Sequence, residues 1–300
     1  MRLFTLTRRD GAPLAGYVSG ADGPALVLAN GLGGPVTAFR HQVRHFEGRY
    51  RVVSWDYRGL YASRGPSRPS RVDVEAQAED LEDLLDAAGV KSAVVVGWSM
   101  GVQVALELAL RAPERVSELV LINGAQGRPM ANLRVPTASR WLPFLLERAR
   151  THHALASRLV ARATHFRLGA DLARGIGLVS PRLGSDEILD LAREFQTLDF
   201  DVYLRTLAAL ERHDPTPALH RLMVRTLVIA GGKDPLFSPR VGRALSERLR
   251  HAELYVVPHA THYAPLEFPE LVNARIDAFL AATRRSPSTA EGLLSDARAD

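Results

Sequence analysis

The chain has 300 residues, a formal net charge of +5, and 46% hydrophobic and 24% charged residues. This length and composition suit a large globular domain and exclude an intrinsically disordered chain. The sequence contains no cysteine, which excludes disulfide bonds, a thiolate nucleophile and cysteine-ligated metal sites. It has neither an apolar run of membrane-spanning length nor an apolar segment behind Met1–Asp10, so we expect a cytoplasmic protein without integral membrane association.

The positive charge does not follow the pattern of a nucleic-acid-binding protein. Residues 128–182 contain ten arginines and two acidic residues, whereas residues 183–224 contain eight acidic residues and four arginines. Adjacent segments of opposite charge are expected to neutralise each other. Binding to a phosphate backbone would require unopposed basic charge interleaved with aromatic residues, so we expect no nucleic-acid partner.

Short apolar segments alternate with amphipathic helical patterns, which is typical of a mostly parallel sheet flanked by helices. The eight predicted strands are Arg2–Thr7, Leu14–Val18, Ala25–Asn30, Arg51–Trp55, Ala93–Gly97, Leu119–Asn123, Thr226–Ala230 and Glu253–Val257. The first two strands alternate between apolar and polar residues and are expected to form an antiparallel edge. The predicted helices of this core are Val36–Phe46, Val74–Ala88, Met100–Arg111, Pro239–Arg250 and Glu267–Ala282.

The regular alternation stops after Asn123. Residues 128–222 contain no clear strand pattern but several amphipathic stretches, one of which follows Ser185 as a candidate N-cap. We interpret residues 128–222 as an all-helical lid, inserted into a core formed by residues 1–127 and 223–284. Residues 285–300 are polar and are expected to form a disordered tail.

The segment Gly97-Trp98-Ser99-Met100-Gly101 joins a predicted strand to a predicted helix. A Gly-x-Ser-x-Gly sequence in this context is a nucleophile elbow, a strained turn that lifts the serine hydroxyl clear of the sheet. Glycine is needed two residues before and two residues after the serine, because a side chain there would collide with the turn. The amides at the start of the helix can stabilise a negatively charged oxygen. Ser99 is therefore the candidate nucleophile.

A serine hydroxyl is a weak nucleophile at neutral pH and needs a base that titrates near pH 7, which is histidine. That histidine needs an acceptor on its second ring nitrogen, which fixes the tautomer. The candidate bases near the last strand are His259 and His262. The candidate acids are Asp234, which follows a predicted strand, and Asp199 and Asp214, which fall in the predicted lid.

These motifs resemble the α/β-hydrolase superfamily, in particular its lidded, single-domain, esterase-like branch. The resemblance implies the α/β-hydrolase fold and a catalytic triad in the order serine, acid, histidine. Ser99 and Asp234 stand where the family has its nucleophile and acid. His262 begins a family-like His-x4-Glu-x-Pro sequence with Glu267 and Pro269, whereas His259 does not have this spacing.

The resemblance also implies an oxyanion hole formed by the backbone amides of Leu32 and Met100. The loop that contains Leu32 has Asn30 where the family has histidine, and Thr261 stands where the family has glycine before the catalytic histidine. The glycines of this loop permit a close approach to the serine.

The sequence Asp56-Tyr57-Arg58-Gly59 resembles a structural turn of the family, in which Tyr61 replaces a final glycine. Asp56 and Arg58 are therefore expected to be structural.

Two other kinds of site fit the sequence poorly. A dinucleotide site would use the glycines of residues 31–34 and Asp56, but the third glycine of the fingerprint is missing. His41 and His45 have the spacing of zinc ligands on a helix, but Gln42 stands where a zinc protease has glutamate. We therefore expect neither a metal ion nor an organic cofactor.

The chain is thus expected to be a serine hydrolase that cleaves a small to medium-sized, mainly apolar carboxylic ester or lactone through an acyl-enzyme. Candidate substrate contacts are Trp98, beside the nucleophile, and Trp141 and Phe144 in the predicted lid. Serine at position 99 argues, by the resemblance, against haloalkane dehalogenases and epoxide hydrolases, which have aspartate there. Three alternatives stay open: C–C bond hydrolysis, cofactor-free perhydrolysis on the same triad, and a non-catalytic ligand sensor on this scaffold.

Overall fold

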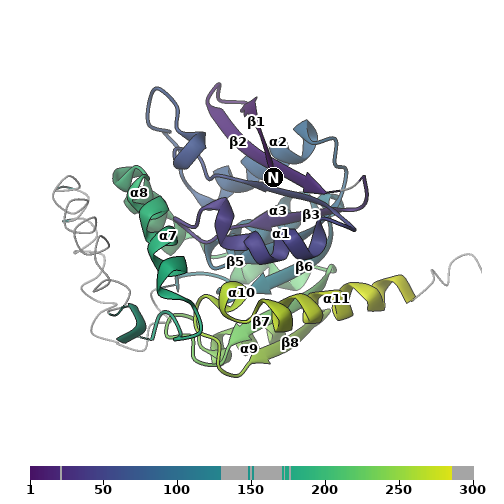
Figure 1. Ribbon diagram of the computed structural model, residues 1–300. Coiled ribbons are helices and arrows are strands. Elements are labelled where there is room, and N and C mark those ends of the chain that lie inside the picture. The colour runs from purple at the N-terminus through teal and green to yellow at the C-terminus, as the bar shows by residue number, and fades with distance from the viewer. Residues whose placement is uncertain are drawn as a thin grey trace, which may run out of the picture.

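The computed structural model describes residues 1–20, 22–129, 148, 151, 171, 173–175 and 177–285. An eight-stranded sheet in the order β1-β2-β4-β3-β5-β6-β7-β8 runs through the centre of the molecule (Figure 1). Its strands are β1 (Arg2–Thr7), β2 (Pro13–Gly20), β3 (Ala25–Ala29), β4 (Arg51–Trp55), β5 (Ala93–Trp98), β6 (Val116–Ile122), β7 (Arg225–Gly231) and β8 (Ala252–Val257). All eight predicted strands are present; the largest shift is in β6, which begins at Val116 instead of Leu119.

The pairing of the strands follows their apolar patterns. β1 pairs antiparallel with β2, and β2 pairs antiparallel with β4, as expected for the two strands that alternate in polarity. The remaining neighbours pair in parallel. Every residue of β3 and β5 is buried, because helices cover both faces of the parallel part of the sheet. The carboxyl ends of these parallel strands therefore meet at one edge of the sheet.

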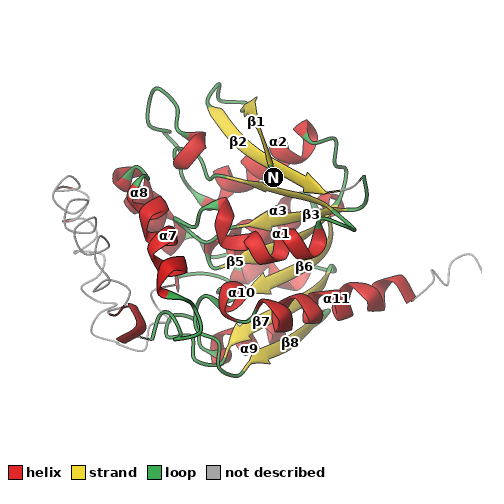
Figure 2. Ribbon diagram, in the orientation of Figure 1, coloured by secondary structure: helices red, strands yellow, loops and turns green. Residues whose placement is uncertain are grey.

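Helices cover the two faces of the sheet (Figure 2). One face packs against α1 (Arg40–Phe46), α10 (Ala264–Glu267) and α11 (Pro269–Arg285), and the other packs against α2 (Val74–Ala87), α3 (Met100–Arg111) and α9 (Pro239–Arg248). Short 3-10 turns connect these elements: η1 (Val36–Phe39), η2 (Tyr61–Ser63), η3 (Pro113–Arg115) and η5 (Thr216–Arg221).

Two of the predicted helices differ from the observed ones. The predicted helix Val36–Phe46 begins with the 3-10 turn η1 and becomes α-helical at Arg40. The predicted helix Glu267–Ala282 is divided into α10 and α11. Proline has no amide hydrogen and its ring clashes with the preceding turn, so Pro269 starts a new helix instead of continuing α10. The helix α11 ends at Arg285, and residues 286–300 of the predicted tail lie outside the described residues.

Two amphipathic helices lie between β6 and β7 in the chain: α7 (Ser185–Gln196) and α8 (Phe200–Arg212). Figure 1 shows them together on one side of the sheet. The structure describes no strand between Ile122 and Arg225. The prediction that Ser185 caps α7 is wrong: Gly184 is the N-cap and Ser185 is the first helical residue. The Glu187 side chain accepts from the Gly184 amide at 3.2 Å, and this bond sets the start of the helix.

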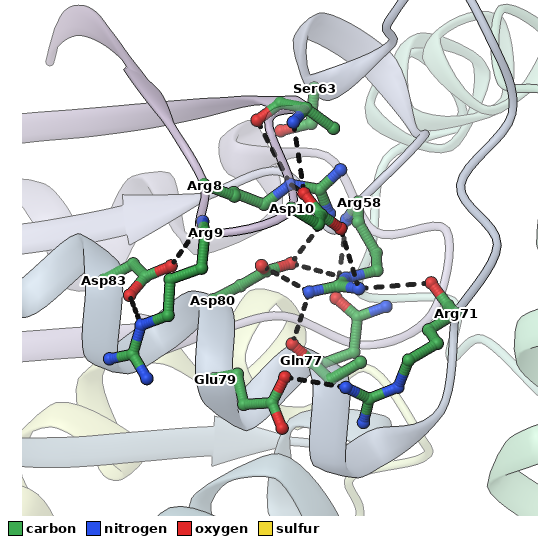
Figure 3. A network of polar contacts seen from close by, with 12 residues as sticks. Arg8, Arg9, Asp10, Arg58, Ser63, Arg71, Gln77, Glu79, Asp80 and Asp83 are labelled. Carbon is green, nitrogen blue, oxygen red and sulfur yellow. Dashed lines mark hydrogen bonds and ion pairs between the residues drawn. The ribbon is translucent and has the colours of Figure 1, made fainter.

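The turn after β4 is held by a buried ion pair (Figure 3). The guanidinium of Arg58 donates two hydrogen bonds to Asp80 of α2, at 2.6 and 2.8 Å, and a third to the Ala76 carbonyl at 2.9 Å. Arg8 contacts the same carboxylate at 3.4 Å. Asp56 is also buried and accepts from the Tyr17 hydroxyl at 2.8 Å. These contacts anchor the turn to its surroundings, in agreement with the structural role expected for this motif.

None of the helices in the described part of the chain has both the length and the apolarity that a membrane span requires.

Candidate active site

Ser99 lies in the sharp turn between β5 and α3. Its φ of 56° is in the left-handed region, where a residue with a β-carbon is strained. A β-carbon on Gly97 would lie 2.3 Å from the Gly101 carbonyl oxygen, and one on Gly101 would lie 2.0 Å from the Ala29 carbonyl oxygen. Only glycine fits at these two positions, so the sequence around the serine permits this turn.

The structure brings Ser99, His262 and Asp234 together at the carboxyl edge of the sheet, after β5, β8 and β7 respectively. The Nε2 atom of His262 lies 3.1 Å from the Ser99 Oγ. The Nδ1 atom of His262 lies 3.0 Å from Asp234 Oδ2. His262 is 6% exposed and Asp234 is 1% exposed. A hydroxyl, an imidazole and a carboxylate thus form one hydrogen-bonded chain that is largely removed from solvent.

The competing sequence candidates lie elsewhere. His259 is exposed on the loop before His262. Asp199 is the N-cap of α8 and forms an ion pair with Arg68 at 2.8 Å. Asp214 accepts from the Thr216 amide at 3.1 Å. Each of these three side chains thus lies in local surroundings that do not include Ser99.

Asp234 is held in a single orientation by the backbone that follows it. Its Oδ1 accepts from the amides of Leu236 and Phe237, at 2.8 and 3.0 Å. Its Oδ2 accepts from the Asn123 side chain at 2.9 Å in addition to facing His262. These contacts aim one carboxylate oxygen at the imidazole.

The loop that carries His262 is tied to the segment before α7, which sequence reasoning did not foresee. Glu267 is 4% exposed, and its carboxylate accepts from the amides of Thr261 at 2.8 Å and Ser180 at 2.7 Å. The Thr261 hydroxyl lies 2.5 Å from the same carboxylate and 2.8 Å from the Leu178 carbonyl oxygen. The two hydroxyl contacts require threonine in place of the family's glycine, and this replacement is their only signal in the sequence.

The two amides expected to form the oxyanion hole are those of Leu32 and Met100. Leu32 lies in the loop after β3, and Met100 is the first residue of α3. Among the described residues, neither amide has a hydrogen-bond acceptor. A β-carbon on Gly31 would lie 3.2 Å from the Ser99 Cβ, so this loop closely approaches the serine.

A cavity of about 490 Å³ opens beside Ser99 and His262. The loop of residues 31–34 and Trp98 form one part of its wall, and α7 and α8 form another. The polar side chains among the described lining residues are Ser99, Tyr203, His262 and Tyr263, and none of the described lining residues is charged. The other two predicted substrate contacts, Trp141 and Phe144, lie outside the described residues.

Trp98 also supports the histidine. Its indole Nε1 donates to the His262 carbonyl at 2.9 Å, and the two rings lie 5.7 Å apart. A residue predicted as a substrate contact therefore has a second contact, to the backbone of the candidate base.

No group of three or more candidate metal ligands occurs in the described ranges. His45 instead lies 2.6 Å from Asp277, which also pairs with Arg49.

This fold, with a serine, a histidine and an aspartate aligned at the strand ends, defines a hydrolase. Residues 24–269 match the family model described as alpha/beta hydrolase fold, so the chain belongs to this family and is an enzyme.

Two relatives that match most of the chain carry the names of hydrolases. The 3-oxoadipate enol-lactonase 2 of Acinetobacter baylyi is 29% identical over 276 residues, which are 92% of this chain and 96% of that protein. A protein of Caulobacter sp. (strain K31), provisionally named as the carbamate hydrolase RutD, is 30% identical over 264 residues, 87% of this chain and 92% of that protein. Among solved structures, a hydrolase from Pseudomonas aeruginosa PA01 is 26% identical, with a TM-score of 0.73 over 93% of this chain and 98% of that chain.

Proposed function

We propose that the chain is a serine hydrolase that cleaves a small to medium-sized, mainly apolar carboxylic ester or lactone through an acyl-enzyme. The observation that carries this proposal is the continuous contact from Ser99 through His262 to Asp234, at 3.1 and 3.0 Å. A serine with this pair behind it can be deprotonated as it attacks a carbonyl carbon.

In the first half of the reaction, the Ser99 Oγ attacks the acyl carbon while His262 Nε2 accepts the hydroxyl proton. His262 then donates that proton to the leaving oxygen, and the C–O bond breaks. Asp234 accepts a hydrogen bond from Nδ1, which keeps Nε2 free of a proton in the resting enzyme and stabilises the imidazolium. In the second half, His262 activates water, which releases the acid and restores Ser99.

The negative charge of the tetrahedral intermediate needs donors placed in advance. The amides of Leu32 and Met100 fit this role because neither has an acceptor in the described part of the chain. Met100 begins α3, so the positive end of the helix dipole adds to the stabilisation.

The cavity supports an uncharged, mainly apolar substrate. Its volume of about 490 Å³ suits a small molecule. A carboxylate group would lose its hydration on entry without gaining a cationic partner among the described lining residues. Relatives named for enol-lactone and carbamate hydrolysis support an acyl compound as the substrate.

We further propose that residues 128–222 act as a lid over this cavity. Residues of α7 and α8, including Leu191, Phe195 and Tyr203, supply part of the wall. A wall of this kind excludes water and strengthens the interactions inside the site. C–C bond hydrolysis and perhydrolysis use the same three residues, and the names of the relatives favour the ester and lactone reaction over both.

Labelling with a fluorophosphonate, followed by mass spectrometry of the adduct, tests the mechanism. We expect the adduct on Ser99, and turnover of chromogenic esters that Ser99→Ala abolishes without altering the circular dichroism spectrum. A vinylogous diketone is offered alongside the esters, and preferential cleavage of the diketone would replace the ester assignment. Hydrolysis that persists in Ser99→Ala would refute the mechanism, and saturable binding without turnover by the native chain would favour a ligand sensor.

A further inference from the structure

Asn123 is a buried polar residue at the carboxyl end of β6, the strand that lies between those preceding Ser99 and Asp234. It is 2% exposed. Its backbone amide donates to the Ile229 carbonyl at 2.9 Å, and its Oδ1 accepts from the Gly231 amide at 3.0 Å. Both contacts fix Asn123 to β7, the strand that leads to Asp234.

The side-chain Nδ2 of Asn123 has an acceptor for each of its two hydrogens. One is Asp234 Oδ2 at 2.9 Å, and the other is the Thr261 carbonyl oxygen at 2.6 Å. Thr261 immediately precedes His262. The orientation of the amide is unambiguous, because a flip would place its oxygen against two oxygen atoms and its NH2 against an N–H group.

The backbone of Asn123 is also unusual. Its φ is 46°, in the left-handed region, which asparagine tolerates better than most residues that have a side chain. A residue held in this region by several contacts beside a reactive centre indicates a positioning role.

We propose that Asn123 is a positioning residue for the candidate triad, because its amide group holds the Asp234 carboxylate and the loop of His262 at a fixed separation. This inference rests on the proposed function. The connection is direct: the same Asp234 Oδ2 faces both Asn123 Nδ2 and His262 Nδ1. Asn123 is absent from the lining of the cavity, so its effect is on the reacting groups and not on substrate contact.

Asn123→Asp tests this role with a side chain of the same shape. Aspartate keeps an oxygen for the Gly231 amide but places a second oxygen against Asp234 Oδ2 and the Thr261 carbonyl. We expect kcat per active site to fall about tenfold or more while KM stays within about twofold. The acid limb of the kcat/KM profile should move to higher pH, because added negative charge beside the triad favours a protonated base.

Asn123→Gly is a second variant that accepts the positive φ without strain. It removes the side-chain hydrogen bonds and adds no charge. We therefore expect kcat to fall, and the acid limb of the kcat/KM profile to move to higher pH by less than in Asn123→Asp. The titratable side chains that contact the His262 ring in the described part of the chain are Asp234 and Tyr263, and both variants retain them.

Asn273→Ala is the matched control. Asn273 is also a buried asparagine, at 5% exposure, and its side chain contacts Gln42 and the His41 carbonyl and none of the three triad residues. Its loss should lower thermal stability and leave the pH profile and the kcat per active site within about twofold of the native values. Fluorophosphonate titration supplies the number of active sites in each preparation.

A native chain that labels at Ser99, with kcat and the acid limb unchanged in both Asn123 variants, would overturn the inference and leave the proposed function standing. A kcat loss and a limb shift equal to those of Asn273→Ala would also overturn it. Absence of labelling at Ser99 in the native chain would refute the proposed function and the inference together. If Asn123→Asp does not fold, Asn123→Gly decides by the same criteria.

Discussion

Asn30 and Asn123 lie at the carboxyl ends of two parallel strands, each with 2% exposure, but their side chains have opposite hydrogen-bonding states. The amide of Asn123 binds three partners, whereas the Nδ2 and Oδ1 of Asn30 have none among the described residues. An unpaired buried amide opposes folding, whereas a fully paired one becomes costly only when it is removed. The two residues should therefore respond oppositely to the same substitution.

Replacing each asparagine by leucine measures this difference. Asn30→Leu should leave the free energy of unfolding unchanged or raise it by about 1 kcal/mol, because leucine has a similar size and needs no partner. Asn123→Leu should lower the free energy of unfolding by about 3 kcal/mol, because it strands the Gly231 amide and the Thr261 carbonyl and places leucine at a positive φ. Urea unfolding at neutral pH gives both values, and equal destabilisation by the two variants would contradict the contrast.

The ion pair between Arg58 and Asp80 should be important for stability, because both side chains are at most 4% exposed. Asp80→Asn removes the buried counter-ion of the guanidinium and leaves only the exposed Asp10 carboxylate, at 3.6 Å, so the free energy of unfolding should fall by about 3–5 kcal/mol. The exposed pair of Asp190 and Arg193 is the control, and Asp190→Asn should change stability by less than about 0.5 kcal/mol. Thermal unfolding compares the two, and a similar melting temperature for both variants would show that burial does not decide the effect.

The contribution of Asp199 to stability should depend on pH. Burial favours a higher pKa for Asp199, but hydrogen bonds from Arg68 and from the amides of Val202 and Asp201 outweigh it and hold the pKa below its usual value. A lowered pKa means that the ionised form stabilises the folded state above the unfolded-state pKa of about 4. That stabilisation is lost as the pH falls through the lower folded-state pKa.

Asp199→Ala removes the cap of α8 and should cost about 1–2 kcal/mol at neutral pH. The difference from the native chain should shrink when unfolding is measured at progressively lower pH, below about 4. A constant difference across this range would show that the ionisation of Asp199 does not contribute to stability.

The uncharged lining of the cavity predicts selectivity between two esters of the same length. An ester with a terminal methyl group on its acyl chain should be cleaved with a kcat/KM about 100-fold or more above that of its counterpart with a terminal carboxylate. The comparison is made on the native enzyme at neutral pH, with a common leaving group. Equal rates would indicate a cationic group at the site and would remove the argument for an apolar substrate.

The local elements and the position of the serine could be predicted from the sequence. Alternating or continuous apolar patterns identify strands wherever the sheet covers one or both of their faces, and all eight predicted strands occur. The two glycines around Ser99 identify the elbow, because the collision they avoid is with neighbouring backbone. Asp234 and His262 were assigned by the resemblance, since the residues alone also allowed Asp199, Asp214 and His259.

Tertiary structure alone determined the contacts that hold these groups in place. Asn123 is 111 residues from Asp234 and 138 residues from Thr261, and Ser180 is 87 residues from Glu267. The periodicity of the sequence does not indicate which distant residues form these hydrogen bonds. The packing of parallel strands, and not their spacing in the chain, brings the strand ends together. Apolar patterning thus determined which segments form the sheet, and the glycines around Ser99 determined where the elbow lies. The folded arrangement decided which buried polar atoms find partners, since each hydrogen bond needs two atoms within about 3 Å in a defined direction.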